Sequence, residues 1–167
     1  MQAALQQFYY FFNTQQHYFL CHDILEEAWK ENPSYSKEDA VVSLILFATG
    51  CYHHRRNNFK GARKSFNKAK RVIQQHQHPQ LGLHIDHYIR LIDQLLELAE
   101  EAKPFIPVEL PMTEEMKQQV IERYPDYQFT KVMTEDRYII DHHLLRDRRA
   151  VLEARLQALN NKHKNHR

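Results

Sequence analysis

A segment that is apolar on almost every side, from about Lys37 to His54, constrains the fold more than any other part of the chain. A helix of this kind lies at the centre of a protein, because each of its faces must pack against another element. Ser36 is a suitable N-cap, and Asp39 three positions later completes the pattern of a capping box. The continuous apolar run within the segment, Ala40 to Tyr52, is too short to span a bilayer. The segment therefore predicts a central helix surrounded by other helices.

Composition and helix-breaking residues extend this prediction to the rest of the chain. Three glycines and six prolines among 167 residues favour an all-α fold. We expect a compact bundle of about five core helices, followed by a C-terminal extension that ends in a long helix. The expected helices cover about 3–12, 15–31, 37–54, 59–77, 83–103, 114–124 and 135–160, and the other expected N-caps are Asn13 or Thr14, Asn58 and Thr113.

The chain is expected to divide after residue 103. Residues 1–103 form the helical core domain, and 104–167 hold a proline-rich connection, a short helix and the long C-terminal helix, packed on or near the core. The aromatic run Phe8 to Phe12 is either a core element or a contact in a homo-oligomer, and the sequence leaves both open. One side of the last helix is expected to carry Leu145, Leu152, Leu156 and Leu159.

Several classes of protein are excluded. No signal peptide or membrane-spanning segment is recognisable, and Cys21 and Cys51 fall at helical positions typical of small core residues. We therefore expect a cytoplasmic protein without a disulfide framework. The absence of a glycine-rich phosphate loop, a nucleophile elbow and a Cys-x-x-Cys pair sets aside the enzymes that depend on them.

The stretch from His22 to Trp29 places ionisable side chains on a helix face that is otherwise apolar. His22 lies within the apolar stripe, and Glu26, one turn later, lies at its edge beside Trp29. Asp23 lies about 100° round the helix and is expected to face solvent or a neighbouring helix end. A buried imidazole or carboxylate needs a hydrogen-bonding, ionic or metal partner, because burial without one is costly.

A second histidine, His53, lies at the end of the central helix, and we expect it to meet His22 in the interior. Two imidazoles and one carboxylate, from His22, Glu26 and His53, match the ligand set of an open zinc or non-haem iron site. The alternative is a hydrogen-bonded core network in which Asn58 caps its helix, and single buried histidines are more often of this kind. Gly61, one turn into the next helix, permits a close approach to that helix.

Positive charge is segregated along the chain. Between Ala40 and Ile85 there are eight Lys and Arg residues and no Asp or Glu. A helix face of one sign attracts nucleic acid or an acidic partner. The alternative is a solvated face balanced by acidic helices elsewhere, in line with a net charge of only +2. The eight residues are Arg55, Arg56, Lys60, Arg63, Lys64, Lys68, Lys70 and Arg71.

Two motifs occur at a characteristic separation: Tyr18-Phe19 with His22-Asp23-Ile24-Leu25-Glu26-Glu27-Ala28-Trp29, and Tyr52-His53 with Arg55-Arg56 and Asn58-Phe59-Lys60-Gly61-Ala62-Arg63. Over residues 14–75 the chain thereby resembles a family of small helical proteins of bacteria and archaea, domain of unknown function 309. Asp23 stands where that family usually has Glu, Asn57 where Gly is common, and Leu46 where Gln is common. The resemblance implies an all-helical fold and no established activity.

Three hypotheses about function follow. The favoured one is a helical protein without an assigned reaction, whose buried polar cluster is structural or borders a ligand pocket and consists of His22, Glu26, Trp29, His53 and Asn58. The second is a metal-dependent enzyme, such as a hydrolase, in which His22, Glu26 and His53 hold a divalent cation. The third is an interaction module that binds nucleic acid or an acidic partner through the Arg55–Arg71 face.

Overall fold

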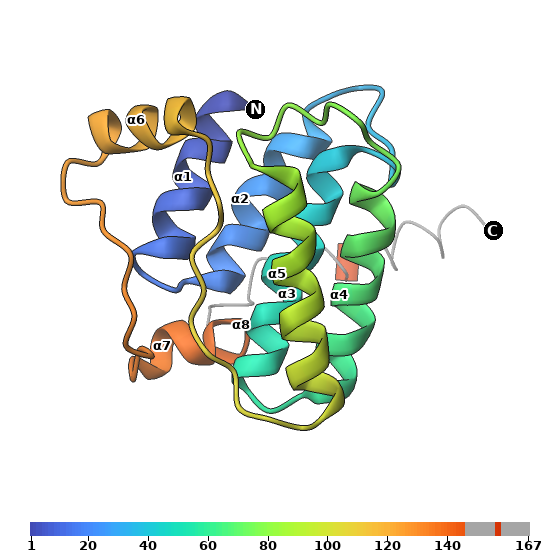
Figure 1. Cartoon of the computed structure of the whole chain (residues 1–167), viewed down its shortest axis with the longest axis vertical. Coiled ribbons are helices and arrows are strands. Elements are labelled where there is room, and N and C mark those ends of the chain that lie inside the picture. Colours follow the sequence, from blue (N-terminus) through green and yellow to red (C-terminus); the bar gives the residue numbers. More distant parts are fainter. Residues whose placement is uncertain (146–155, 158–167) are drawn as a thin grey trace.

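The computed structural model describes residues 1–145, 156 and 157. Within these residues it contains eight helices and no strand, so the all-α prediction is confirmed (Figure 1). None of the eight helices is long and apolar enough to cross a membrane. They are α1 (Gln2–Asn13), α2 (Tyr18–Lys30), α3 (Ala40–Arg55), α4 (Phe59–Ile73), α5 (Ile85–Glu100), α6 (Glu114–Arg123), α7 (Arg137–Ile140) and α8 (His142–Leu145).

The predicted central helix is α3. It packs against α2 and α4, while α4 also packs against α5 and α2 against α1 (Figure 1). Leu44, Phe47 and Ala48 in the middle of α3 are completely buried. Because apolar residues occur on most sides of α3, the chain can bury them only by placing other helices around it.

α3 begins at Ala40, later than the predicted start near residue 37. Its N-cap is Asp39, whose Oδ2 accepts a hydrogen bond from the Ser36 backbone N–H at 2.8 Å, the backward contact expected of a capping box. The same oxygen also accepts a hydrogen bond from the Trp29 indole at 3.0 Å. Residues 37–39 are therefore held as a turn by side chains and do not form the first turn of the helix.

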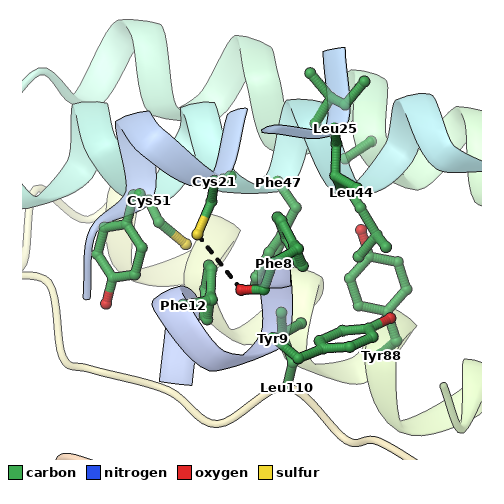
Figure 2. Packing of buried hydrophobic residues seen from close by; sticks show 14 of the residues in the cluster. Phe8, Tyr9, Phe12, Cys21, Leu25, Leu44, Phe47, Cys51, Tyr88 and Leu110 are labelled. Atoms are coloured by element: carbon green, nitrogen blue, oxygen red, sulfur yellow. Dashed lines mark hydrogen bonds between the residues drawn. The ribbon is translucent and has the colours of Figure 1, made fainter. Parts of the chain in front are cut away.

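The aromatic run at the start of the chain belongs to the core. Phe8, Tyr9 and Phe12 are buried, and Figure 2 shows them beneath α2 and α3. The Tyr9 hydroxyl donates a hydrogen bond to the Leu81 carbonyl at 2.6 Å, and the rings of Phe12 and Phe47 are 5.7 Å apart. Of the two alternatives left open for this segment, the core element is therefore the one observed.

Both cysteines are free and completely buried. The Cys21 thiol donates a hydrogen bond to the Phe8 carbonyl at 3.5 Å, drawn as a dashed line in Figure 2. Burial raises the pKa of Cys21 and Cys51 well above the ordinary value of a thiol. Since the thiolate is the reactive form, neither residue is a candidate nucleophile at neutral pH.

α2 begins at Tyr18, later than predicted, because a residue expected to cap it is engaged elsewhere. Asn13 is completely buried, and its Oδ1 accepts a hydrogen bond from the Leu110 backbone N–H at 3.0 Å. Its Nδ2 donates to the Tyr127 hydroxyl, also at 3.0 Å. The predicted cap at residue 13 or 14 is wrong, and His17 occupies the N-cap position.

The other two predicted caps are confirmed. Asn58 Oδ1 accepts a hydrogen bond from the Gly61 backbone N–H at 3.1 Å, at the start of α4. Thr113 Oγ1 accepts from the Met116 backbone N–H at 3.3 Å, at the start of α6. α4 and α5 are both shorter than predicted, with an irregular segment over 74–84 between them.

The connection after α5 runs back across the bundle, and the following α6 packs against α1 (Figure 1). Phe105 and Leu110 in this connection, and Val120 in α6, join the hydrophobic core formed by the first five helices. The Tyr124 ring then stacks on the Tyr10 ring of α1 at 4.1 Å. The domain boundary predicted after residue 103 stays a prediction.

The prediction of one long helix from residue 135 is wrong over 135–145, because two short helices, α7 and α8, occupy this stretch. Asp141 interrupts them and forms ion pairs with Arg56 at 3.1 Å and with Arg137 at 2.6 Å. The remainder of that prediction, including Leu152 and Leu159, lies mostly outside the described residues.

Candidate functional site

One face of α2 brings together three groups that can bind a cation. His22, Asp23 and Glu26 each offer one ligand atom, and these atoms lie within 4.8 Å of one another. His22 Nδ1 is 3.1 Å from Asp23 Oδ1 and 3.7 Å from Glu26 Oε2. The three side chains keep 27%, 38% and 34% of their surface exposed, so solvent and ions can reach them. His22 and Glu26 share a face because they are at i and i+4, whereas the carboxylate of Asp23, at i+1, reaches the imidazole from about 100° round the helix.

The opposite side of Glu26 faces Lys30. The Lys30 ammonium contacts Glu26 Oε1 at 2.7 Å, whereas the other carboxylate oxygen, Oε2, faces His22. Glu26 therefore keeps one oxygen directed toward the imidazole while the other is neutralised by an i,i+4 ion pair.

His53 is not a member of this group. It is half-buried, and its Nδ1 accepts a hydrogen bond from Asn58 Nδ2 at 3.1 Å while Asn58 Oδ1 caps α4. A side chain at Gly61 would clash with both Asn58 and His53. An added Cβ would lie 2.6 Å from Asn58 Nδ2 and 3.1 Å from His53 Cγ. Burial, and then the charge of Arg56, lowers the pKa of His53. These three residues form one local unit at the junction of α3 and α4.

The histidine that α3 buries is His54, not His53. His54 is completely buried, and its Nε2 donates to the Lys103 carbonyl at 2.9 Å. Burial lowers the pKa of His54. The expectation that His22 and His53 meet in the interior is therefore corrected, because both are only half-buried. Sequence periodicity could not separate two adjacent histidines on a helix that is apolar on most sides.

Trp29 belongs to a third group of contacts, at the C-terminal end of α2. Its indole N–H points at Asp39 Oδ2 and at the Ser36 carbonyl, at 3.0 and 3.2 Å. Trp29 and Asp39 also line an open cavity of about 480 Å³ together with Val41 and Leu81. The indole therefore holds the turn before α3 and forms one wall of a pocket.

A cluster of aromatic rings and histidines joins the α2 face to α8, and it was not predicted. Ring centroids of Phe19 lie 5.9 Å from His22, 5.2 Å from Tyr52 and 5.8 Å from His143. The Tyr52 hydroxyl forms a hydrogen bond with His143 Nδ1, 91 positions later in the chain. Phe19 and Tyr52 both belong to the motifs quoted above, but no local spacing could indicate that α8 covers them.

Two arginines predicted to lie on the basic face lie beneath α7 and α8 instead. Arg55 donates hydrogen bonds to the Gln16 carbonyl at 2.6 Å and to the Ile139 carbonyl at 3.3 Å, and its guanidinium lies 4.5 Å from the Tyr18 ring centre. Arg56 is held by Asp141, as described above. Both arginines therefore anchor the C-terminal helices to the end of α3, and the basic face begins later.

Comparison with known proteins assigns the chain to a family. A family model described as a domain of unknown function, DUF309, matches residues 5–65. The uncharacterized protein YpuF of Bacillus subtilis (strain 168) is 31% identical over 150 residues, which is 86% of this chain and 86% of that protein. This chain belongs to the DUF309 family. No solved structure matches it.

The DUF309 model covers only part of the site. It extends from α1 into the first half of α4 and so includes the His22 group, His53 and Asn58. The helices α7 and α8, which complete the cluster around Phe19, lie outside it. Membership of DUF309 confirms the resemblance stated from the motifs and brings no assigned function with it.

Proposed function

We propose that this DUF309 protein binds a divalent cation on α2, with His22, Asp23 and Glu26 as its ligands. The observation that carries the proposal is the convergence of their three ligand atoms within 4.8 Å. One imidazole with two carboxylates suits borderline and hard cations such as Zn²⁺ and Mn²⁺. Three protein ligands leave coordination positions for water or for an anionic ligand.

The charges around the group support the proposal. Asp23 and Glu26 place two carboxylates beside one imidazole, and Lys30 neutralises the oxygen of Glu26 that faces away from His22. A cation can therefore replace the contacts of His22 Nδ1 without breaking the ion pair to Lys30. Because the side chains are already gathered on one rigid helix, little ordering is needed when the cation binds.

This ligand set differs from the one predicted from the sequence, which included His53. Recruiting His53 would require its ring to leave Asn58, whose side chain also caps α4. We therefore propose the α2 group without it. Hydrolysis by a metal-bound water, the predicted enzymatic alternative, stays a prediction that depends on this site.

A titration on protein purified without a histidine tag and stripped with chelator tests the proposal. Isothermal titration with Zn²⁺ and Mn²⁺ should show one equivalent bound. At about 100 times Kd the cation should stabilise the fold by about 2.7 kcal/mol, which is a rise in Tm of roughly 5–10 °C at this chain length.

Glu26→Gln and Glu27→Gln form a matched pair on the same helix. Glu26→Gln should weaken binding at least about tenfold, because it removes a ligand, whereas exposed Glu27 lies outside the group and its variant should bind as the wild type does. The metal-free variants should unfold within about 1 kcal/mol of the wild type, because both sites are solvent-accessible. No binding of either cation, or equal losses in the two variants, would refute the proposal.

A further inference from the structure

We propose that the outer ridge of α4 docks on the phosphate backbone of double-stranded DNA. The ridge consists of Lys60, Lys64, Lys68 and Arg71, which are all exposed. Among the described residues, none of the four forms an ion pair. The proposal concerns a surface separate from the His22 group and does not depend on cation binding there.

The structure selects these four from the eight basic residues of the region. Arg55 and Arg56 lie beneath the C-terminal helices, as shown above. Arg63 reaches the Ala99 carbonyl at 3.5 Å, and Lys70 pairs with Asp93 at 2.7 Å. These contacts hold four of the positive charges against the rest of the protein and leave the others on the side of α4 that faces away from the bundle.

The ridge has a regular geometry. Its residues follow one another at intervals of four, four and three, so they lie within about 80° of one another around the helix axis. From Lys60 to Arg71 they span about 16 Å along that axis. On the opposite side of α4, Ala62, Phe66 and Ala69 are completely buried, and α4 packs there against α3 and α5. The helix is therefore held in place, and the charges are presented as a fixed row.

The charge pattern matches a uniform polyanion. No acidic residue occurs between Ala40 and Ile85, so α3, α4 and the loop between them add no opposing charge. Duplex DNA carries one phosphate charge per about 1.7 Å of its axis, and a row of cations at helical spacing can contact several phosphates at once. Such contacts are independent of sequence, since they do not reach the base edges.

Two features favour duplex DNA over other polyanions. Phe66 is buried and Phe59 is half-buried against His54, so α4 offers no exposed ring on which the bases of a single strand could stack. The ridge also has no apolar centre, because the exposed residue between its lysines is Asn67. Protein interfaces are built around an apolar core, so an acidic protein is the less suitable partner.

Fluorescence anisotropy on the full chain, with a labelled 24-base-pair duplex as the probe, tests the proposal. Four phosphate contacts predict a slope of about −3.6 in log K against log salt concentration. Affinity should then fall by roughly a hundredfold between 50 and 200 mM salt. The double variant Lys64→Gln/Lys68→Gln should bind more weakly and halve the slope to about −1.8.

The matched control is Lys37→Gln/Lys131→Gln, which removes the same net charge at two exposed lysines outside α4. It should keep the wild-type slope and most of the affinity, and circular dichroism should show that all three proteins are equally helical. Equal weakening by both double variants would overturn the proposal in favour of a net-charge effect. So would no binding to the duplex at 50 mM salt, or tighter binding to a single strand or to a polyglutamate peptide.

Discussion

Acid should destabilise this protein through one buried histidine, His17. Its residue surface is only 7% exposed, and its ring lies 4.8 Å from that of His142. Burial, followed by the charges of His142 and Arg55, lowers the pKa of His17 from 6.5 to about 4, against the smaller opposing effects of a backbone hydrogen bond and of Asp136. His17 Nδ1 has no hydrogen-bond partner among the described residues, so no hydrogen bond at that nitrogen favours the protonated ring. The folded state therefore holds His17 neutral.

The direction and size of the effect follow from linkage. In the unfolded chain His17 takes up a proton near pH 6.5, whereas in the folded protein it does so only near pH 4. The contribution of His17 to the free energy of unfolding is therefore fully present above pH 6.5. It falls as the pH drops toward 4 and is lost below that. The shift corresponds to about 3 kcal/mol in total and to roughly 1 kcal/mol per pH unit near pH 5. The lowered pKa values of His53 and His54 act in the same direction.

Urea unfolding between pH 7.5 and 4.5 measures this effect for the wild type and for His17→Gln, whose amide does not titrate. Contributions from carboxylates cancel in the difference between the two proteins. The wild type should lose about 2.5 kcal/mol relative to the variant over this range, because pH 4.5 still lies above the folded-state pKa of about 4. The same exchange at exposed His78 is the control. Its free energy of unfolding should depend on pH as that of the wild type does. Parallel curves for the wild type and His17→Gln would refute the reasoning.

Two further substitutions test the packing that positions the site. Asn13→Ala should lower the free energy of unfolding by about 2–4 kcal/mol, because the buried Leu110 N–H loses its acceptor and the Tyr127 hydroxyl its donor; unchanged urea midpoints would contradict this. Gly50→Ala should cost about 1–3 kcal/mol, since the new Cβ would lie 2.5 Å from the buried Phe66 ring. A calorimetric Tm at or above that of the wild type would show that the ring can move aside.

Features that depend only on residues close together in the sequence were predicted well. The caps at Asn58 and Thr113 follow from a side-chain oxygen placed before a helical segment, and both are observed. The proximity of His22 and Glu26 follows from their i,i+4 spacing. Asn13 shows the limit of this reasoning, because it is an equally suitable cap by sequence but its side chain binds the connection near Leu110.

The predicted last helix is interrupted for a similar reason, because side chains near its start bind residues that are distant in the sequence. Asp141 pairs with Arg56, 85 positions earlier, and Tyr52 with His143 across 91 positions. Contacts at such separations depend on how the helices pack, and no local pattern contains them. They also decide which basic residues remain exposed, because Arg55 and Arg56 are removed from the predicted face by α7 and α8.

The sequence by itself determined the helical class and the central place of α3, because a helix that is apolar on most sides can be buried only among other helices. It also determined that His22 and Glu26 share a face, since that follows from the pitch of one helix. Only the tertiary structure decided that His54 is buried in place of His53, that α8 closes over Phe19, and which four charges form the α4 ridge. Each of these depends on which helices meet, and that is set by packing over the whole chain.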